Sequence, residues 1–155
     1  MSTLLAVDLG LRSGLALYGD DGRLRWYRSH NFGSAGRMQR GAYAILNDIP
    51  DLAWLVLEGS GQLDRVWLKE VRRRELEFLQ ISAETWRPAL LHPRQQRSGK
   101  SAKQHADRLA RSVIEWSGAP RPTSLRHDAA EAILIGLWGV IEIGWLTDIP
   151  PQFGV

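Results

Sequence analysis

The sequence predicts an α/β fold in which one five-stranded mixed sheet is flanked by helices. Short apolar runs bounded by turn residues recur along the chain and are typical of strands. After the first three runs, longer segments with apolar residues at helical spacing alternate with them. The expected order is three strands, then helix, strand, helix and strand, and finally two helices.

Five strands are expected, at residues 3–9, 14–18, 23–29, 53–58 and 89–92. The first three are joined by the turn Gly10–Ser13 and by the tight turn Asp20-Asp21-Gly22. Because such short connections join antiparallel neighbours, these three strands are expected to form an antiparallel meander. Pro88 is expected to open the fifth strand, since proline is tolerated at the start of a strand.

Four helices are expected, at residues 35–48, 64–84, 102–116 and 127–142. The third has the clearest pattern, because apolar residues fall at i, i+3, i+4, i+7 and i+8 between Ala106 and Ile114. The second carries large apolar residues that we expect to share one packing face: Trp67, Val71, Phe78 and Ile81. Residues 118–126 are expected to be a linker, and the tail from about residue 144 to be irregular.

Length and composition indicate one domain spanning residues 1–155. The chain has a mass of 17.5 kDa and 44% hydrophobic residues, enough to bury a core. It has no cysteine, which excludes disulfides, thiol catalysis and thiolate metal sites. Because no run approaches the ~20 apolar residues that span a bilayer and no signal-peptide pattern is evident, we expect a cytoplasmic protein without membrane association.

Positive charge is concentrated in two segments. Residues 23–40 contain five arginines and no acid, and residues 92–111 contain six basic residues and one acid, Asp107. Segregation of this kind favours a track for a polyanion such as nucleic acid. The alternative is that both segments are ordinary solvated faces.

Four carboxylates occupy positions from which they can reach one point. Asp8 and Glu58 each end an apolar strand, and Asp128 and Glu131 are three residues apart on one helix face. If the two strands are neighbours, alternation of side chains places their terminal carboxylates side by side at one edge of the sheet. Open α/β sheets usually carry their sites at such an edge.

Clustered carboxylates suit a divalent-metal nuclease. Mg²⁺ prefers oxygen ligands and keeps several of its waters, so a few acids together with substrate phosphate satisfy it. Two such ions, about 3.5–4 Å apart, can stabilise both the attacking and the leaving oxygen of a phosphodiester. We therefore expect two Mg²⁺ ions at Asp8, Glu58, Asp128 and Glu131, with Mn²⁺ able to substitute.

Three of the four acids also have a purely structural interpretation, whereas Glu58 ends so apolar a strand that it needs partners or a metal if buried. Asp8 alone can cap the turn before Gly10, and Asp128 can be the N-cap of its helix with Glu131 as the reciprocal acid of a capping box. These alternatives stay open for each residue taken alone. The nuclease interpretation is favoured because the structural one requires four separate coincidences.

The residues resemble a known family. The motifs are Val7-Asp8-Leu9-Gly10-Leu11-Arg12-Ser13-Gly14-Leu15-Ala16, Leu57-Glu58, His92-Pro93-Arg94-Gln95 and Asp128-Ala129-Ala130-Glu131-Ala132. In this order they resemble the RuvC family of Holliday junction resolvases, which have the RNase H-like (retroviral integrase-like) fold. The resemblance covers most of the chain, although Glu131 stands where the family more usually has aspartate.

The resemblance implies a Mg²⁺-dependent, structure-selective endonuclease that resolves four-way DNA junctions in recombination and repair. It implies that the four acids bind metal, and that Lys103, or Lys100 as a competing candidate, supports the scissile phosphate. It also implies a homodimer, in a prokaryote or phage. The expected DNA-contacting residues are Arg12, Arg94, Arg97, Lys100 and Lys103.

The chain departs from the family pattern at two places. The loop Gly59–Leu63 offers Leu63 where bacterial members usually carry an aromatic wedge, and the next helix, at residues 67–74, is bulky where relatives have small residues. Substrate choice is therefore expected to extend to other branched DNA. Two alternatives stay open: a non-catalytic module that binds branched nucleic acid, and an RNA-directed RNase H-like nuclease of the ribosomal RNA processing type. An actin-like ATPase is disfavoured, because it needs two such lobes.

Overall fold

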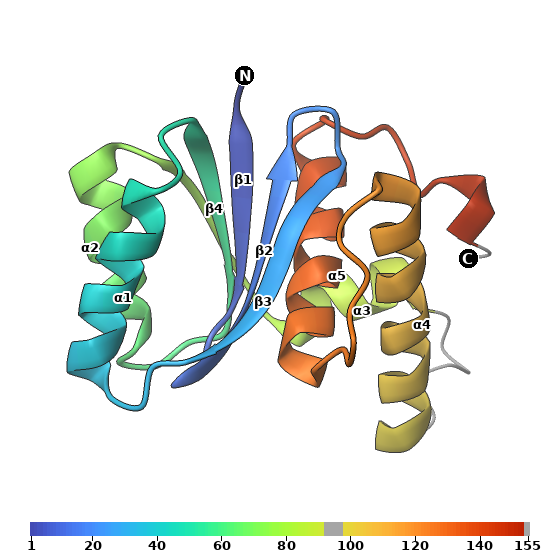
Figure 1. Ribbon diagram of the computed structural model, residues 1–155, viewed down its shortest axis with the longest axis horizontal. Helices are drawn as coiled ribbons and strands as arrows, with labels where there is room; N and C mark the ends of the chain where they lie inside the picture. The colour runs from blue at the N-terminus through green and yellow to red at the C-terminus, as the bar shows by residue number, and fades with distance from the viewer. Residues whose placement is uncertain (92–97, 154–155) are drawn as a thin grey trace.

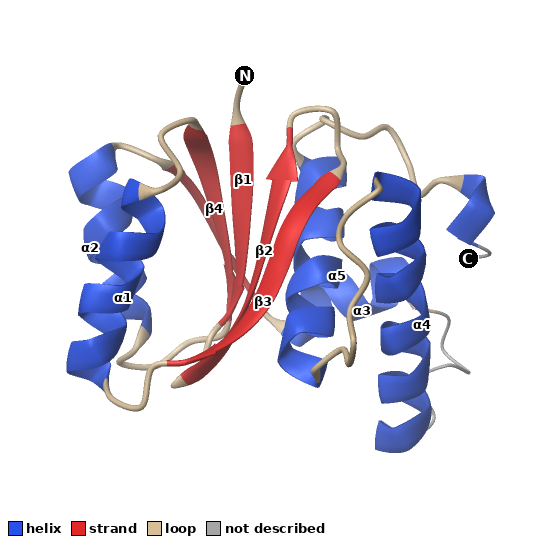
Figure 2. Cartoon of the chain, viewed as in Figure 1, coloured by secondary structure: helices blue, strands red, loops and turns tan. Residues whose placement is uncertain are grey.

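The computed structural model describes residues 1–91 and 98–153, and its sheet has five strands in that part of the chain. The strands are β1 (Thr3–Asp8), β2 (Arg12–Gly19), β3 (Leu24–Asn31), β4 (Leu52–Glu58) and β5 (Glu77–Ile81). Their spatial order is β3-β2-β1-β4-β5. The first three pair antiparallel, whereas β4 runs parallel to β1 and β5 parallel to β4. Figure 2 shows β1 to β4 between the helices. The predicted mixed five-stranded α/β sheet is confirmed.

Helices cover both faces of this sheet (Figure 1). On one face lie α1 (Ala35–Asn47) and α2 (Asp64–Arg74). On the other lie α3 (Ala83–Leu90), α4 (Gly99–Ser117) and α5 (His127–Glu142). A short 3-10 helix, η2 (Pro151–Phe153), packs on α4 through an edge contact between the rings of Trp116 and Phe153. Among the described residues, no helix is both long enough and apolar enough to cross a bilayer.

Alternation along the central strands decides which way the terminal acids face. In β1, Leu5 and Val7 join the core beneath α1 and α2, whereas Leu4 and Ala6 join the core beneath α5. Because side chains alternate with a period of two, Asp8 lies on the same face as Ala6. The same alternation in β4 places Glu58 on the face of Val56, which also contacts the α5 core. Both strands therefore present their last carboxylate to the α5 side.

Helix α5 lies unusually close to the sheet, because glycines remove the side chains that would separate them. A Cβ built on Gly136 would lie 2.2 Å from a ring carbon of Tyr18. A Cβ built on Gly14 would lie 1.8 Å from the carbonyl oxygen of Asp128. Gly14 is the register partner of Asp8, so the first turn of α5 rests beside the end of β1.

The predicted helix at residues 64–84 is wrong, because the chain divides there into α2 and β5. Helix α2 ends where Glu75 takes the left-handed conformation, with φ 54°, and the amide of Leu76 donates to the carbonyl of Val71 at 3.0 Å. In β5, Phe78 packs toward α1 and α2, while Ile81 packs toward α5. The stripe that these residues were expected to form with Trp67 and Val71 therefore spans a helix and a strand.

The predicted strand at residues 89–92 is also wrong. Helix α3 (Ala83–Leu90) includes residues 89 and 90, with Pro88 inside it, and Trp86 and Leu90 are buried together one helical turn apart. His92 lies outside the described residues. The helix expected at 102–116 starts earlier, at Gly99, because the hydroxyl of Ser98 caps it by accepting from the amide of Ser101 at 3.0 Å.

The remaining expected elements agree with the structure apart from small shifts at their ends. The helices expected at residues 35–48 and 127–142 correspond to α1 and α5, and residues 118–126 connect α4 to α5 without helix or strand. In the tail, η2 is the element that the sequence did not predict.

The contact between Gly14 and Asp128 yields a stability prediction. Gly14→Ala should lower the free energy of unfolding by about 1–3 kcal/mol, because the new methyl group overlaps a backbone carbonyl and must push α5 away. Gly36→Ala in α1 is the matched control, since its Cβ would meet nothing nearer than 4.0 Å. Urea unfolding should show the loss for Gly14→Ala and no loss for Gly36→Ala. Equal stability of the two variants would contradict the close approach.

Candidate functional site

Asp8 and Glu58 are brought together by strand pairing. They are register partners in the parallel ladder between β1 and β4, and their side chains share a hydrogen bond. Just beyond them, the amide of Leu9 donates to the carbonyl of Glu58 at 3.0 Å, which holds the two strand ends in place. The adjacency predicted from the two apolar runs is therefore present in the structure.

The surroundings of Asp8 favour its protonated form. Burial raises the pKa of Asp8 to about 8, and the charge and hydrogen bond of Glu58 add to the effect. Smaller contributions come from the charges of Glu131 and Asp128. The other three predicted acids thus act on the carboxyl group of Asp8, and a cation bound there would relieve the repulsion among the four.

Asp128 reaches this region from the first turn of α5. One carboxylate oxygen accepts a hydrogen bond from the hydroxyl of Ser29 at 2.9 Å, and the other accepts from the amide of Ala129 at 2.7 Å. The N-cap of α5 is Arg126, which makes no side-chain cap hydrogen bond. The interpretation of Asp128 as the N-cap is therefore wrong, although its position near the helix N-terminus is electrostatically favourable.

Glu131 is the most deeply buried of the four acids, with 7% of its side chain exposed. Its Oε1 accepts a hydrogen bond from Nη2 of Arg87 on α3 at 2.9 Å, and Nε2 of His127 lies 2.9 Å from the same oxygen. Both neighbours therefore compete with a metal ion for this oxygen.

These side-chain directions keep Asp128 and Glu131 from joining Asp8 and Glu58 in one group. Over residues 1–91 and 98–153, no group of three or more histidine or acidic side chains stands close enough together to hold a metal ion. The cause is visible in the contacts: Glu131 turns to Arg87, and Asp128 turns to Ser29. Binding of one ion by Asp8, Glu58 and an α5 acid requires the α5 side chain to leave its present partner. The donor set is all oxygen, which suits Mg²⁺ or Mn²⁺.

A small pocket opens beside Glu131, between α3, α4 and α5. Its volume is about 140 Å³, and its polar lining residues are Arg87, Lys103, His127 and Glu131. Lys103 lies on the first turns of α4 and is exposed. Lys100 is exposed on the same helix but is not among the lining residues. The geometry therefore places Lys103 nearer to the acids than its competitor.

The other predicted DNA-contacting residues are only partly described. Arg12 is exposed at the start of β2, and Arg94 and Arg97 lie outside the described residues. The basic segment 23–40 is partly used within the fold, since Arg25 pairs with Asp51 at 3.6 Å and Arg28 stacks over the ring of Trp26. This segment is thus less free for a polyanion than its charge suggests.

Sequence reasoning missed two members of the site, Arg87 and Ser29. Arg87 was placed in no motif, because the segment around it was expected to change from helix to strand. Ser29 pairs in register with Gly14, which itself pairs with Asp8, so the ladder carries it to the acids. A prediction of the pairing register between β2 and β3 would have placed Ser29 beside the acids.

The raised pKa of Asp8 predicts how the metal-free protein responds to pH. The stability gained from protonating Asp8 in the folded state is fully present below its unfolded pKa of about 4. It is lost as pH rises through the folded value of about 8. Asp8→Asn should therefore be most stabilising, relative to the original chain, at pH 8 and above, and least at pH 4.

Thermal unfolding in EDTA across this pH range measures the effect. Asp48→Asn, which changes an exposed acid at the end of α1, is the control and should follow the original chain. A melting temperature difference for Asp8→Asn that does not change between pH 4 and 8 would contradict the assigned environment.

Arg87→Gln should strengthen Mn²⁺ binding several-fold, because it removes both a positive charge and a competitor for the Glu131 carboxylate. The same change should destabilise the metal-free protein, since Glu131 stays buried with one fewer cation. Calorimetric titration with Mn²⁺ compares it with Arg111→Gln, which breaks an ion pair with Asp107 in which both partners are exposed. Unchanged or weaker Mn²⁺ binding by Arg87→Gln would contradict the competition.

In comparisons with known proteins, no protein-family model matches the chain and no curated protein matches it. The likeness to RuvC resolvases therefore depends on the motif residues and their order.

Proposed function

We propose that the protein is a metal-dependent nuclease of the RNase H-like type that hydrolyses phosphodiesters at branched DNA, with Holliday junction resolution as its main activity. One observation carries the proposal. Asp8 and Glu58 end neighbouring parallel strands in register and share a hydrogen bond, and the charges of Asp128 and Glu131 act on the same carboxyl group. Acids gathered at strand ends suit metal-assisted hydrolysis.

The strand arrangement supports the RNase H-like assignment. An antiparallel meander of β1 to β3 is followed by β4 and β5, which extend the sheet in parallel on the other side of β1. The resemblance of the four motifs to RuvC resolvases points to the same fold. The α/β class itself would suit many activities, so the acids carry the function and the topology supports it.

Two Mg²⁺ ions, or Mn²⁺ in their place, would be held by Asp8, Glu58, Asp128 and Glu131. When bound, such ions supply a water nucleophile of lowered pKa and stabilise the charge on the attacked phosphate. The acids of the chain bind and orient the ions, and their mutual repulsion makes binding favourable. Asp8 would lose its proton when an ion binds, because a nearby cation favours its charged form.

The basic residues beside the acids have separate roles. Lys103 offsets negative charge at the scissile phosphate from the pocket that it shares with Glu131. Arg87 holds Glu131 in the metal-free protein and becomes free to meet a phosphate when Glu131 turns to the ions. His127 holds the same carboxylate from within α5 and therefore acts as a positioning residue.

The remaining expectations from the resemblance are parts of this proposal. A homodimer would place two such sites on opposed strands of a four-way junction, and the absence of an aromatic wedge in Gly59–Leu63 fits broader use of branched DNA. An RNA-directed nuclease would use the same acids, so its substrate has to be tested directly.

A second candidate function is a nucleic-acid-binding module without catalysis. It is favoured by the ion pair of Arg87 with Glu131, since an acid held permanently by arginine would not bind metal. In that case Asp8 would stay protonated near neutral pH and would share a structural hydrogen bond with Glu58.

Asp8→Asn and Glu58→Gln should each abolish Mg²⁺-dependent cleavage, with a loss of about a thousandfold or more expected when a metal-binding carboxylate is removed. Binding of branched DNA in EDTA should persist. The assay compares an immobile four-way junction, a matched linear duplex, a flap and an RNA duplex, each mapped for incision.

Asp107→Asn, an exposed change on α4, is the control and should retain full cleavage. Cuts confined to the junction support resolution, and preferential cutting of the RNA duplex supports the RNA-directed alternative. If the original chain cuts none of the four substrates with Mg²⁺ or Mn²⁺, the nuclease proposal fails and the binding module is favoured.

A further inference from the structure

Helix α2 carries more positive charge than its surroundings neutralise. It contains two acids and five basic residues. Glu70 is buried and pairs with Arg73 at 3.5 Å and with Arg74 at 3.2 Å. Asp64 accepts a hydrogen bond from the side-chain amide of Gln80 at 3.0 Å. Two of the five cations of the helix therefore have an ion-pair partner within it.

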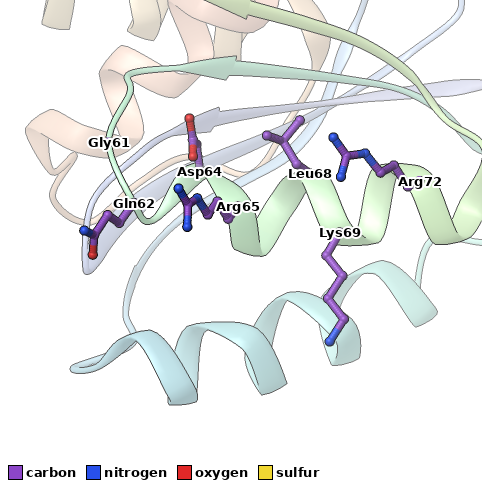
Figure 3. A pocket seen from close by; sticks show the side chains of 7 residues that line it. All are labelled: Gly61, Gln62, Asp64, Arg65, Leu68, Lys69 and Arg72. Atoms are coloured by element: carbon purple, nitrogen blue, oxygen red, sulfur yellow. The ribbon is translucent and has the colours of Figure 1, made fainter.

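The other three cations lie together. Arg65, Lys69 and Arg72 are exposed, and none forms an ion pair with any residue in the described part of the chain. Their spacing of four and three residues places them along one face of α2. They line a pocket of about 700 Å³ with Gly61, Gln62, Asp64 and Leu68 (Figure 3). A wide surface with three cations against the single carboxylate of Asp64 fits a polyanion.

This pocket is connected to the acid site by the loop that follows Glu58. The side-chain amide of Gln80 donates to the carbonyl of Gly59 at 2.9 Å and also to Asp64, so it joins the start of the loop to the first turn of α2. The pocket begins at Gly61, three residues after the catalytic candidate. A nucleic-acid strand that leaves the acids on the α5 side would follow this loop around the end of the sheet to reach the cations of α2 on the other side.

We propose that Arg65, Lys69 and Arg72 form a second nucleic-acid surface, the α2 cation row, which holds the phosphate backbone of a strand leaving the acid site. This inference rests on the proposed nuclease function. From Arg65 to Arg72 the helix rises by about 10 Å, which matches about three nucleotide steps along the axis of one strand. The row is separate from Arg12 and from the basic residues of α4, and it lies on the opposite face of the sheet from α4. Nucleic acid is favoured over an acidic protein because the row continues from the acids through a hydrogen-bonded loop.

The test is binding in EDTA as a function of salt. Junction and single-stranded DNA are titrated with the original chain, with Lys69→Gln and with the triple variant R65Q/K69Q/R72Q. The triple variant should reduce the slope of log affinity against log salt by about two units, and Lys69→Gln should reduce it by about 0.7–0.9. Arg121→Gln, an exposed change beside α4, is the matched control and should leave the slope unchanged.

The outcomes separate this inference from the proposed function. Cleavage and binding by the original chain, with unchanged affinity and slope in the triple variant, would overturn the α2 cation row alone. A loss of affinity in the triple variant no larger than that in Arg121→Gln would overturn the α2 cation row as well. Nucleic-acid binding that depends on the row, in a chain that never cleaves, would support the row and reject the nuclease. Failure of the original chain to bind or cleave any nucleic acid would reject both.

An acidic partner is tested in the same series with polyglutamate. Loss of polyglutamate binding by the triple variant, with DNA binding retained, would assign the row to an acidic protein and overturn the inference. All three variants change exposed side chains, so their melting temperatures should stay within a few degrees of the original chain.

Discussion

The register between β1 and β4 is the constraint on which the candidate site depends. It places Asp8 beside Glu58 at the ends of two apolar strands, where burial and mutual repulsion favour protonation of one of them. Alternation turns both carboxylates toward α5, and Gly14 lets the first turn of that helix rest against the sheet. A one-residue slip of β4 would send Glu58 to the opposite face, so core packing and site geometry are specified together.

The contacts of the α5 acids connect this geometry to function. Arg87 neutralises Glu131, His127 contacts the same carboxylate oxygen, and Ser29 donates to Asp128, so the metal-free protein avoids four unpaired carboxylates in one place. The same partners set a barrier to metal binding, because an ion must displace them. Substrate phosphate can assist, since it offers Arg87 and Lys103 an alternative anion. Metal and nucleic acid should then bind more tightly together than separately.

The parts of the fold that sequence predicted are those with strong periodicity, and its errors have local causes. The apolar runs before Asp8 and Glu58 and the long apolar segment of α5 left little ambiguity. The break after α2 was missed because Glu75, not glycine, takes the left-handed turn. The segment 83–90 is short and contains a proline, so its pattern did not distinguish helix from strand. The positions of Asp8 and Glu58 could be predicted from the apolar strands that they end. The role of Arg87 depends on its contact with Glu131, 44 residues away, which no local pattern encodes.

The most direct test of the account is a crystal structure of the protein with Mn²⁺, in which anomalous scattering locates the ions. The account predicts Mn²⁺ within about 2.0–2.3 Å of carboxylate oxygens of both Asp8 and Glu58. It also predicts that Glu131 or Asp128 has left its present partner to complete the coordination. Ions found elsewhere, or none at all, with Glu131 still paired with Arg87 and Asp8 still bonded to Glu58, would contradict it.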